Sequence, residues 1–293
     1  MLELINILKT GLQGIMNWQV VVLIFICAFW LLLASFQDLK KREVENWWAF
    51  SLVALVLGFR AFCSVYDWNI WPIAWGLIGL IFGFAIANLF YYARMFAAGD
   101  FKLLIAVFSI IPLSCLSFDW KTNLLLACAF LVLLILAGAF YGLLFIIYLT
   151  FRNFRNFKRE FPRQFKKYRR YFFFGIVFFI ILLVIGFLFE IIFMYLGLII
   201  LIASSLLIYS KTIEESCMIR NVKVRDLTIG DWLVFSVKAG NKLIKPDWEG
   251  LSEKNLKIIQ SKLNGNARVV VKEGIPFVPA FLVALLILMY FII

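Results

Sequence analysis

Histidine is absent from this chain of 293 residues, and its cysteines are widely spaced. No two cysteines form the CxxC pair that many zinc and redox sites use. A zinc site would therefore lack its usual ligands, so we expect no metal site and no hydrolysis that depends on a metal. Four of the five cysteines lie in or beside apolar runs, and all are interpreted as structural thiols: Cys27, Cys63, Cys115, Cys128 and Cys217.

Charged residues are also few, at 16% of the chain, whereas hydrophobic residues make up 64% and the mean hydropathy is +0.97. Soluble proteins contain about 25% charged residues, so the composition indicates an integral membrane protein. The formal charge is +12, but the positive residues are concentrated in short stretches between apolar runs. We therefore attribute the charge to orientation in the membrane and expect no nucleic-acid partner.

Long apolar runs predict about eight transmembrane helices, because one crossing needs about 20 mostly apolar residues. A short amphipathic segment at residues 1–18 is expected before the first of them. Residues 171–210 are too long for one crossing and contain Glu190 near their centre, so they are expected to form a transmembrane hairpin that turns there. The other predicted spans are 19–37, 47–65, 71–92, 101–117, 123–150 and 276–293.

Lysine and arginine collect on one side of these spans, and this sets the expected orientation. With the N-terminus outside, the basic residues near 40–42, 94–102 and 151–170 fall on one face, which is expected to be cytosolic. Residues 151–170 alone contain nine lysines and arginines. They are interpreted as a basic cytosolic loop that contacts anionic lipid headgroups, with substrate docking as the less favoured reading.

Polar residues at 211–275 predict a small α+β domain on the cytosolic side, before the last span. A helix is expected at 252–263, with Ser252 as its cap. Strands are expected near 222–224, 232–235 and 268–271. The sequence thus predicts a polytopic α-helical membrane protein whose residues 1–150 form one transmembrane domain of about five helices.

Two aspartates lie where an apolar run meets a short basic stretch. Asp38 ends the first predicted span and Asp100 begins the fourth, so both are expected at the cytosolic boundary. Acid–base hydrolysis needs one carboxyl to activate water and a second to donate a proton. Two carboxyls in a partly dry site do not both ionise readily, so this pair is expected to share a proton, with the acid and the base unassigned. The alternative is that each of these aspartates only caps a helix. A third aspartate, Asp231, also follows a glycine, Gly230, and we interpret it as part of a turn.

The residues around the two aspartates resemble the two catalytic motifs of type IV prepilin peptidases. Residues 34–47, ASFQDLKKREVENW, are similar to the motif of the first aspartate and include Asn46. Ala97-Ala98-Gly99-Asp100 resembles the GxGD motif of the second, and Lys102 follows two places on. Lys102 is expected either to turn toward Asp100 or to extend to the lipid headgroups.

A third segment and two departures refine this resemblance. Residues 274–281 are similar to the segment that opens a late helix in archaeal members, including the preflagellin peptidases. Their Pro276 and Pro279 are helix-start residues with a possible role in substrate gating. Ala97 replaces the first Gly of GxGD, and Glu45 stands where a Pro commonly precedes the Asn. Without the paired CxxC motifs of many bacterial relatives, no N-methyltransferase activity is expected.

The resemblance implies a membrane aspartyl endopeptidase of the archaeal branch, with Asp38 and Asp100 as its catalytic residues. Its substrates would be prepilin- or preflagellin-like precursors, cut on the cytosolic side of the cell membrane to remove a class III signal peptide. No metal or organic cofactor is needed for this reaction. Neither the physiological substrate nor the oligomeric state follows from the sequence.

Two other functions remain open at this stage. Signal peptide peptidases and presenilins also use GxGD and cleave inside the membrane, but their first aspartate follows a Tyr, whereas Gln37 precedes Asp38 here. A non-enzymatic transporter coupled to protons or cations is the second alternative. Such a transporter is expected to have broken helices at corresponding positions in two halves, and the sequence contains no such symmetry.

Overall fold

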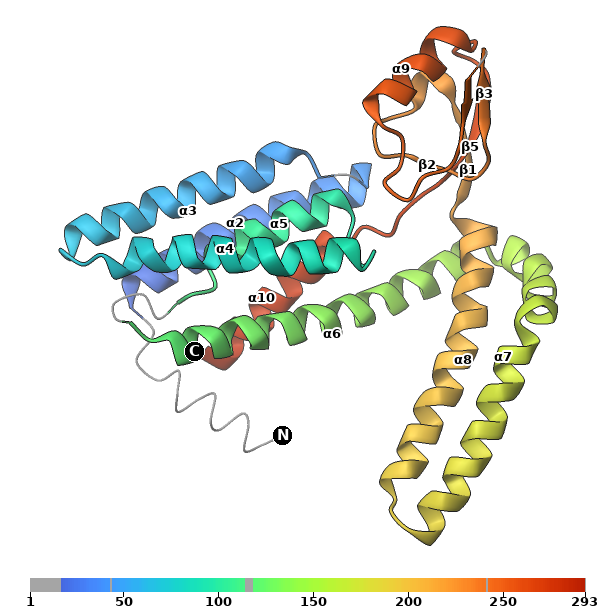
Figure 1. The fold of residues 1–293 in the computed structure, drawn as a ribbon, viewed down its shortest axis with the longest axis horizontal. Helices are drawn as coiled ribbons and strands as arrows, with labels where there is room; N and C mark the ends of the chain where they lie inside the picture. The colour runs from blue at the N-terminus through green and yellow to red at the C-terminus, as the bar shows by residue number, and fades with distance from the viewer. Residues whose placement is uncertain (1–16, 43, 114–117, 241, 293) are drawn as a thin grey trace. The chain divides into compact units, whose positions relative to one another are not determined.

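A computed structural model of the protein describes residues 17–42, 44–113, 118–240 and 242–292. Most of the amphipathic segment predicted at 1–18 and the thiol of Cys115 lie outside the described residues. The chain divides into two compact units, residues 1–142 with 275–293 and residues 143–274 (Figure 1). Each unit is described by itself below.

The first unit is a bundle of helices. Its N-terminal helix is capped by Asn17, whose side chain accepts a hydrogen bond from the Val20 amide, and it ends at Arg42 in the left-handed conformation. Pro72 lies at the start of a later helix, where a backbone N–H would have no acceptor within the helix, so the proline costs no hydrogen bond there. The helices are α2 (Trp18–Lys41), α3 (Asn46–Tyr66), α4 (Trp71–Tyr92), α5 (Ala98–Phe108), the first part of α6 (Trp120–Arg152) and α10 (Val278–Ile292).

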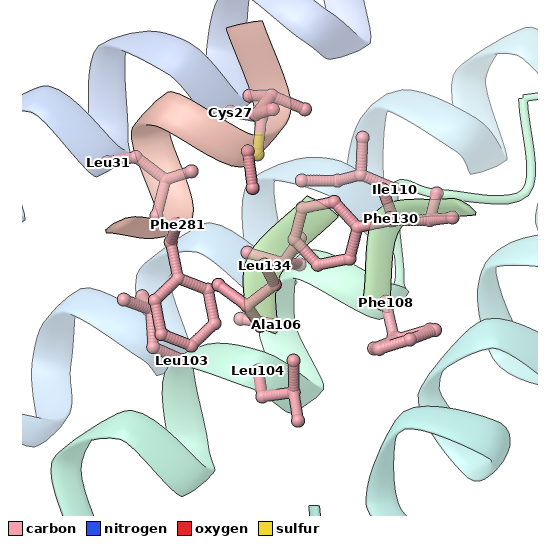
Figure 2. Close-up of a cluster of buried hydrophobic side chains, with 14 of the residues drawn as sticks. Cys27, Leu31, Leu103, Leu104, Ala106, Phe108, Ile110, Phe130, Leu134 and Phe281 are labelled. Carbon is pink, nitrogen blue, oxygen red and sulfur yellow. The ribbon is translucent and has the colours of Figure 1, made fainter. Parts of the chain in front are cut away.

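The core of this unit lies where α2, α5, α6 and α10 meet (Figure 2). Cys27 and Leu31 of α2 are buried there with Phe281 of α10, while α6 contributes Phe130. Glycines bring α4 close to α5: a Cβ at Gly79 would lie 2.1 Å from the Phe108 carbonyl oxygen. Any larger residue at this position would force the two helices apart.

Helix α5 is much shorter than the span predicted at 101–117. It has 11 residues and ends at Phe108, so at 1.5 Å per residue it extends roughly 16 Å, about half of a bilayer core. The described residues contain six helices that are long and apolar enough to cross a membrane: α2, α3, α4, α6 and two helices of the second unit, α7 (Phe154–Leu188) and α8 (Ile192–Cys217). The chain is therefore a mostly helical membrane protein, and the predicted count of eight spans is not confirmed.

The second unit begins with the end of α6 and continues into the hairpin of α7 and α8, which run side by side (Figure 1). The turn falls between Leu188 and Ile192, at the Glu190 predicted from the sequence. Small residues allow the close approach of the two helices, since a Cβ at Gly175 would lie 2.3 Å from Ser204 Oγ.

The basic run at 151–170 was predicted to be a loop, and this was wrong: from Phe154 onward it is the first half of α7. The prediction weighed the charges and overlooked the aromatic residues between them, which recur every three or four positions and so form one stripe along a helix. Phe157 in this stripe packs against Tyr209 of α8, with ring centroids 5.5 Å apart. The stripe consists of Phe154, Phe157, Phe161, Phe165, Tyr168 and Phe172.

The polar part of this unit contains two small sheets and one helix. Its strands are β1 (Ile219–Lys223), β2 (Trp232–Leu233), β3 (Val237–Ala239), β4 (Lys242–Ile244) and β5 (Arg268–Lys272), and a 3₁₀ turn, η1, covers Val224–Asp226. The antiparallel order is β1-β5-β2, with Asn221 opposite Val270, and β3 pairs with β4. Helix α9 (Glu253–Lys262) is capped by Ser252 and buries Ile259 against the core of this part.

Candidate active site

Asp38 lies in the last turn of α2, and its side chain is buried. Its Oδ2 atom accepts a hydrogen bond of 2.9 Å from the amide of Val278, the first residue of α10. Amides in the first turn of a helix have no partner within that helix, so the carboxyl of Asp38 provides one from a different helix. The neighbouring amide of Phe277 also contributes a hydrogen bond to Asp38.

Pro276 and Pro279 flank this contact. Pro276 is buried before the start of α10, and Pro279 is the second residue of the helix. A proline has no N–H to donate, so the amides that reach Asp38 come from the two residues between the prolines. The prolines therefore define which backbone donors face the carboxyl of Asp38.

Asp100 lies in the first turn of α5 and is half-buried. Its Oδ2 atom accepts a hydrogen bond of 3.3 Å from the Ala97 amide. The alternative interpretation of Asp100 as a helix cap is therefore supported in part, by this one long hydrogen bond among the described residues. Ala97 itself has an extended backbone with φ −75°, so the loss of the first Gly of the motif causes no strain there.

The two carboxyls, which come from different helices, are close enough to interact. Desolvation first, and the negative charge of Asp38 second, raise the pKa of Asp100 to about 7, while the Ala97 amide opposes the shift. Asp100 lies outside the six candidate spans. Because each negative charge disfavours the other, the arrangement favours one proton shared between the two groups near neutral pH.

Lys102 has a partner that the sequence did not indicate. Its ammonium donates a hydrogen bond of 2.6 Å to Oδ1 of Asn46, the first residue of α3. Two of the predicted motif residues thus join the start of α5 to the start of α3. Neither of the two orientations expected for Lys102 describes this contact.

Arg60 of α3 is a second link to α5 that sequence reasoning missed. Its guanidinium is buried and donates to the carbonyl oxygens of Ile110 and Pro112, just beyond α5, at 3.0 and 2.8 Å, and to Pro72 at 3.0 Å. Helix α3 therefore holds α5 at both ends. The available signal was a lone arginine in an apolar span, which is costly unless it is paired inside the protein.

Gly99, by contrast, is not required by packing in this conformation. A Cβ at Gly99 would make only ordinary contacts with Val44, at 3.6 to 3.9 Å. Ala98, before it, is exposed. The conformation of this motif therefore does not by itself require a glycine before Asp100.

Two other kinds of site, a cavity and a metal-binding cluster, were considered among the described residues. A cavity of about 330 Å³ in the second unit is lined by Glu214, Trp232, Trp248 and Lys272, among others, and neither aspartate is among its described lining residues. Within the described ranges, no three His, Cys, Asp or Glu side chains gather in a way that could hold a metal ion.

These features define a multi-pass helical membrane protein in which carboxyls from two different helices interact. Residues 25–147 match the model of the type IV leader peptidase family, Peptidase_A24, and this segment contains both aspartates. The match agrees with the resemblance found in the sequence: residues 25–147 are similar to a family of peptidases. No curated protein and no solved structure matches the chain significantly.

Proposed function

We propose that the protein is a membrane aspartyl endopeptidase that removes leader peptides from prepilin- or preflagellin-like precursors, with Asp38 and Asp100 as its catalytic residues. The observation that carries the proposal is the interaction between these two carboxyls, which lie on α2 and α5 within the segment of the family match. One carboxylate takes a proton from water, which attacks the scissile carbonyl, and the other carboxyl protonates the leaving nitrogen.

The cytosolic face is the proposed location of this chemistry. Lys40, Lys41 and Arg42 follow Asp38 directly, and Arg94 and Lys102 flank Asp100. Positive residues of this kind accumulate on the cytosolic side of membrane proteins. In an archaeal cell membrane the enzyme would then cut before the apolar helix of its precursor, while that helix stays in the bilayer.

The aromatic stripe and the basic residues of α7 support a role in lipid binding. Nine lysines and arginines lie between 151 and 170 with a single acidic residue, Glu160. A helix with apolar residues on one face and cations on the others attracts anionic headgroups by about 1 kcal/mol per charge near the surface. We therefore retain anionic lipid as a partner of this segment.

Pro276 and Pro279 are proposed to gate access to the pair. They fix the start of α10, whose amides hold Asp38. A small displacement of α10 by an incoming substrate helix would open a path for water to the carboxyl of Asp38.

The test is cleavage of a panel of leader-bearing precursors by the purified protein in liposomes. Asp38→Asn and Asp100→Asn should each abolish cleavage while insertion in the membrane is retained. Asp231→Asn is the matched control, because Asp231 also follows a glycine but lies in the second unit. Mass spectrometry should place the cut before the apolar helix of the precursor. A cut within that helix would favour intramembrane proteolysis, and full activity of either active-site variant would refute the assignment.

A further inference from the structure

The two aspartates differ in the hydrogen-bond donors that face them. Asp38 accepts from the amides of Val278 and Phe277, whereas the donor to Asp100 among the described residues is the Ala97 amide, at 3.3 Å. Donors directed at a carboxyl favour its charged form. The surroundings of Asp38 therefore favour the carboxylate more than those of Asp100 do.

Tyr141 of α6 lies on the side of that helix that faces the start of α10. Gly138, one turn earlier, packs against Phe277 so closely that a Cβ would lie 2.6 Å from its ring. Residues three apart share one face of a helix, so Tyr141 follows Gly138 toward the residues that hold Asp38. The oxygen of the Tyr141 hydroxyl is shielded from solvent, and the charge of Asp38 acts on this hydroxyl.

We propose that Tyr141 is a positioning residue whose phenol O–H turns to donate to the carboxylate of Asp38 during the reaction, so that Asp38 serves as the base and Asp100 as the acid. The inference rests on the proposed aspartyl peptidase activity. A phenol is a suitable donor because it stays protonated over the neutral range and gives up no proton in the reaction.

The assignment gives a balanced reaction. Asp38 takes one proton from water while the water oxygen bonds to the carbonyl carbon, and Asp100 gives its proton to the peptide nitrogen as the C–N bond breaks. The proton on Asp38 then returns to Asp100 and restores the starting state. Two groups of unequal proton affinity suit these separate roles.

The pH dependence of this arrangement involves few charged groups. Arg42 on α2 and Asp100 on α5 act electrostatically on Asp38, and Tyr141 is the titratable group of α6 beside it. Helix α10 contributes backbone amides and carries no Asp, Glu, Lys or Arg between Val278 and Ile292. Loss of the Tyr141 hydroxyl therefore changes the titration of Asp38 without removing another charge.

The experiment compares Tyr141→Phe with Tyr148→Phe in the full-length protein with a cleavable precursor. Tyr148 is the matched control, because it lies two turns further along α6 with an exposed side chain whose hydroxyl accepts from Arg152. We expect Tyr141→Phe to lower kcat by about 10- to 100-fold, the usual effect of one hydrogen bond to a charged group. KM should change little, and the Tyr148→Phe protein should behave as the unmodified enzyme does.

The acidic limb of the kcat/KM profile supplies the readout that a purely structural role would not change. Without the donor, Asp38 keeps its proton to a higher pH, so this limb should move toward neutral pH. A lower kcat with an unmoved limb, or an unchanged kcat, would overturn the role of Tyr141. If the unmodified protein cleaves no precursor, or if Asp38→Asn remains active, the proposed function fails instead.

Discussion

The chain contains two Gly-Asp pairs with the same local hydrogen bond and different surroundings. In each pair the aspartate accepts from the amide three residues before it: Asp100 from Ala97 at 3.3 Å and Asp231 from Thr228 at 2.8 Å. Asp231 closes a turn in the polar part of the second unit. Asp100 faces a second carboxyl, that of Asp38 on another helix. Desolvation first, and the charge of Asp38 second, raise the pKa of Asp100 to about 7.

Neither the dipeptide nor its local hydrogen bond distinguishes the two aspartates. A lone capping carboxyl is stabilised in its charged form by the helix or turn that it caps. Asp100 differs because the tertiary fold brings a second carboxyl close enough to oppose its charge.

The largest difference is expected between Asp100→Asn and Asp231→Asn. An amide cannot donate or accept a proton as a carboxyl does, so Asp100→Asn should lower kcat by about 10³-fold or more, as losses of essential catalytic groups do. Asp231→Asn keeps an oxygen that can accept from Thr228 and should retain full activity. Initial rates of precursor cleavage measure both. Equal losses in the two variants would mean that the assay reports folding rather than chemistry.

The pH profile should reflect the state of Asp100. Because its pKa is raised to about 7, Asp100 is protonated below that pH and ionised above it. An acid that must be protonated is lost as pH rises, so kcat/KM should fall about tenfold per pH unit above neutrality. Rates between pH 5 and 9 measure this limb. A profile that keeps rising to pH 9 would contradict the assignment of Asp100 as the acid.

A smaller effect is expected from the link between Asn46 and Lys102. Asn46→Ala removes the acceptor of the 2.6 Å hydrogen bond that joins α3 to α5. A typical hydrogen bond contributes about 0.5–1.5 kcal/mol to stability, and one with a charged donor such as Lys102 contributes somewhat more. The start of α5 should then be less ordered, and kcat should fall several-fold with KM nearly constant. Asn46→Asp keeps the acceptor and serves as the control. Equal activity of all three proteins would show that this link does not position Asp100.

The smallest effects concern the glycines of the two pairs. Gly230 has φ +95°, so Gly230→Ala should lower the free energy of unfolding by about 1 kcal/mol. Gly99 does not have a positive φ, and a Cβ there would make an ordinary contact with Val44 at 3.6 Å. Gly99→Ala should therefore leave the free energy of unfolding unchanged. Thermal unfolding of both variants measures this contrast. A loss of cleavage by a stable Gly99→Ala protein would locate the approach of the substrate backbone beside Asp100.

Several elements follow directly from sequence patterns. The start of α2, both ends of α3 and the turn at Glu190 could be predicted because hydropathy and charge change sharply there. The resemblance to the peptidase family could be predicted because the motifs that carry it are local. Both features depend on residues that are neighbours in the chain.

Other elements depend on contacts that are distant in the sequence. The length of α5 could not be predicted because the apolar residues continue past Phe108, while the chain leaves the helix before Pro112 and is held there by Arg60. The contact between Val278 and Asp38 joins residues 240 positions apart. No local pattern reports such a pairing, and for this reason the site residues of the sequence analysis stay a prediction that the experiments above must test.

Helix α5 is attached to α3 at both of its ends, through Asn46 at one and Arg60 at the other. With roughly half the length of a crossing helix, it has no hydrophobic match of its own to the bilayer. The depth of the second aspartate is therefore fixed by a neighbouring protein scaffold and not by the thickness of the surrounding lipid. Cells that remodel their lipid chains with temperature would thin or thicken the membrane around this protein while Asp100 keeps its place relative to α3.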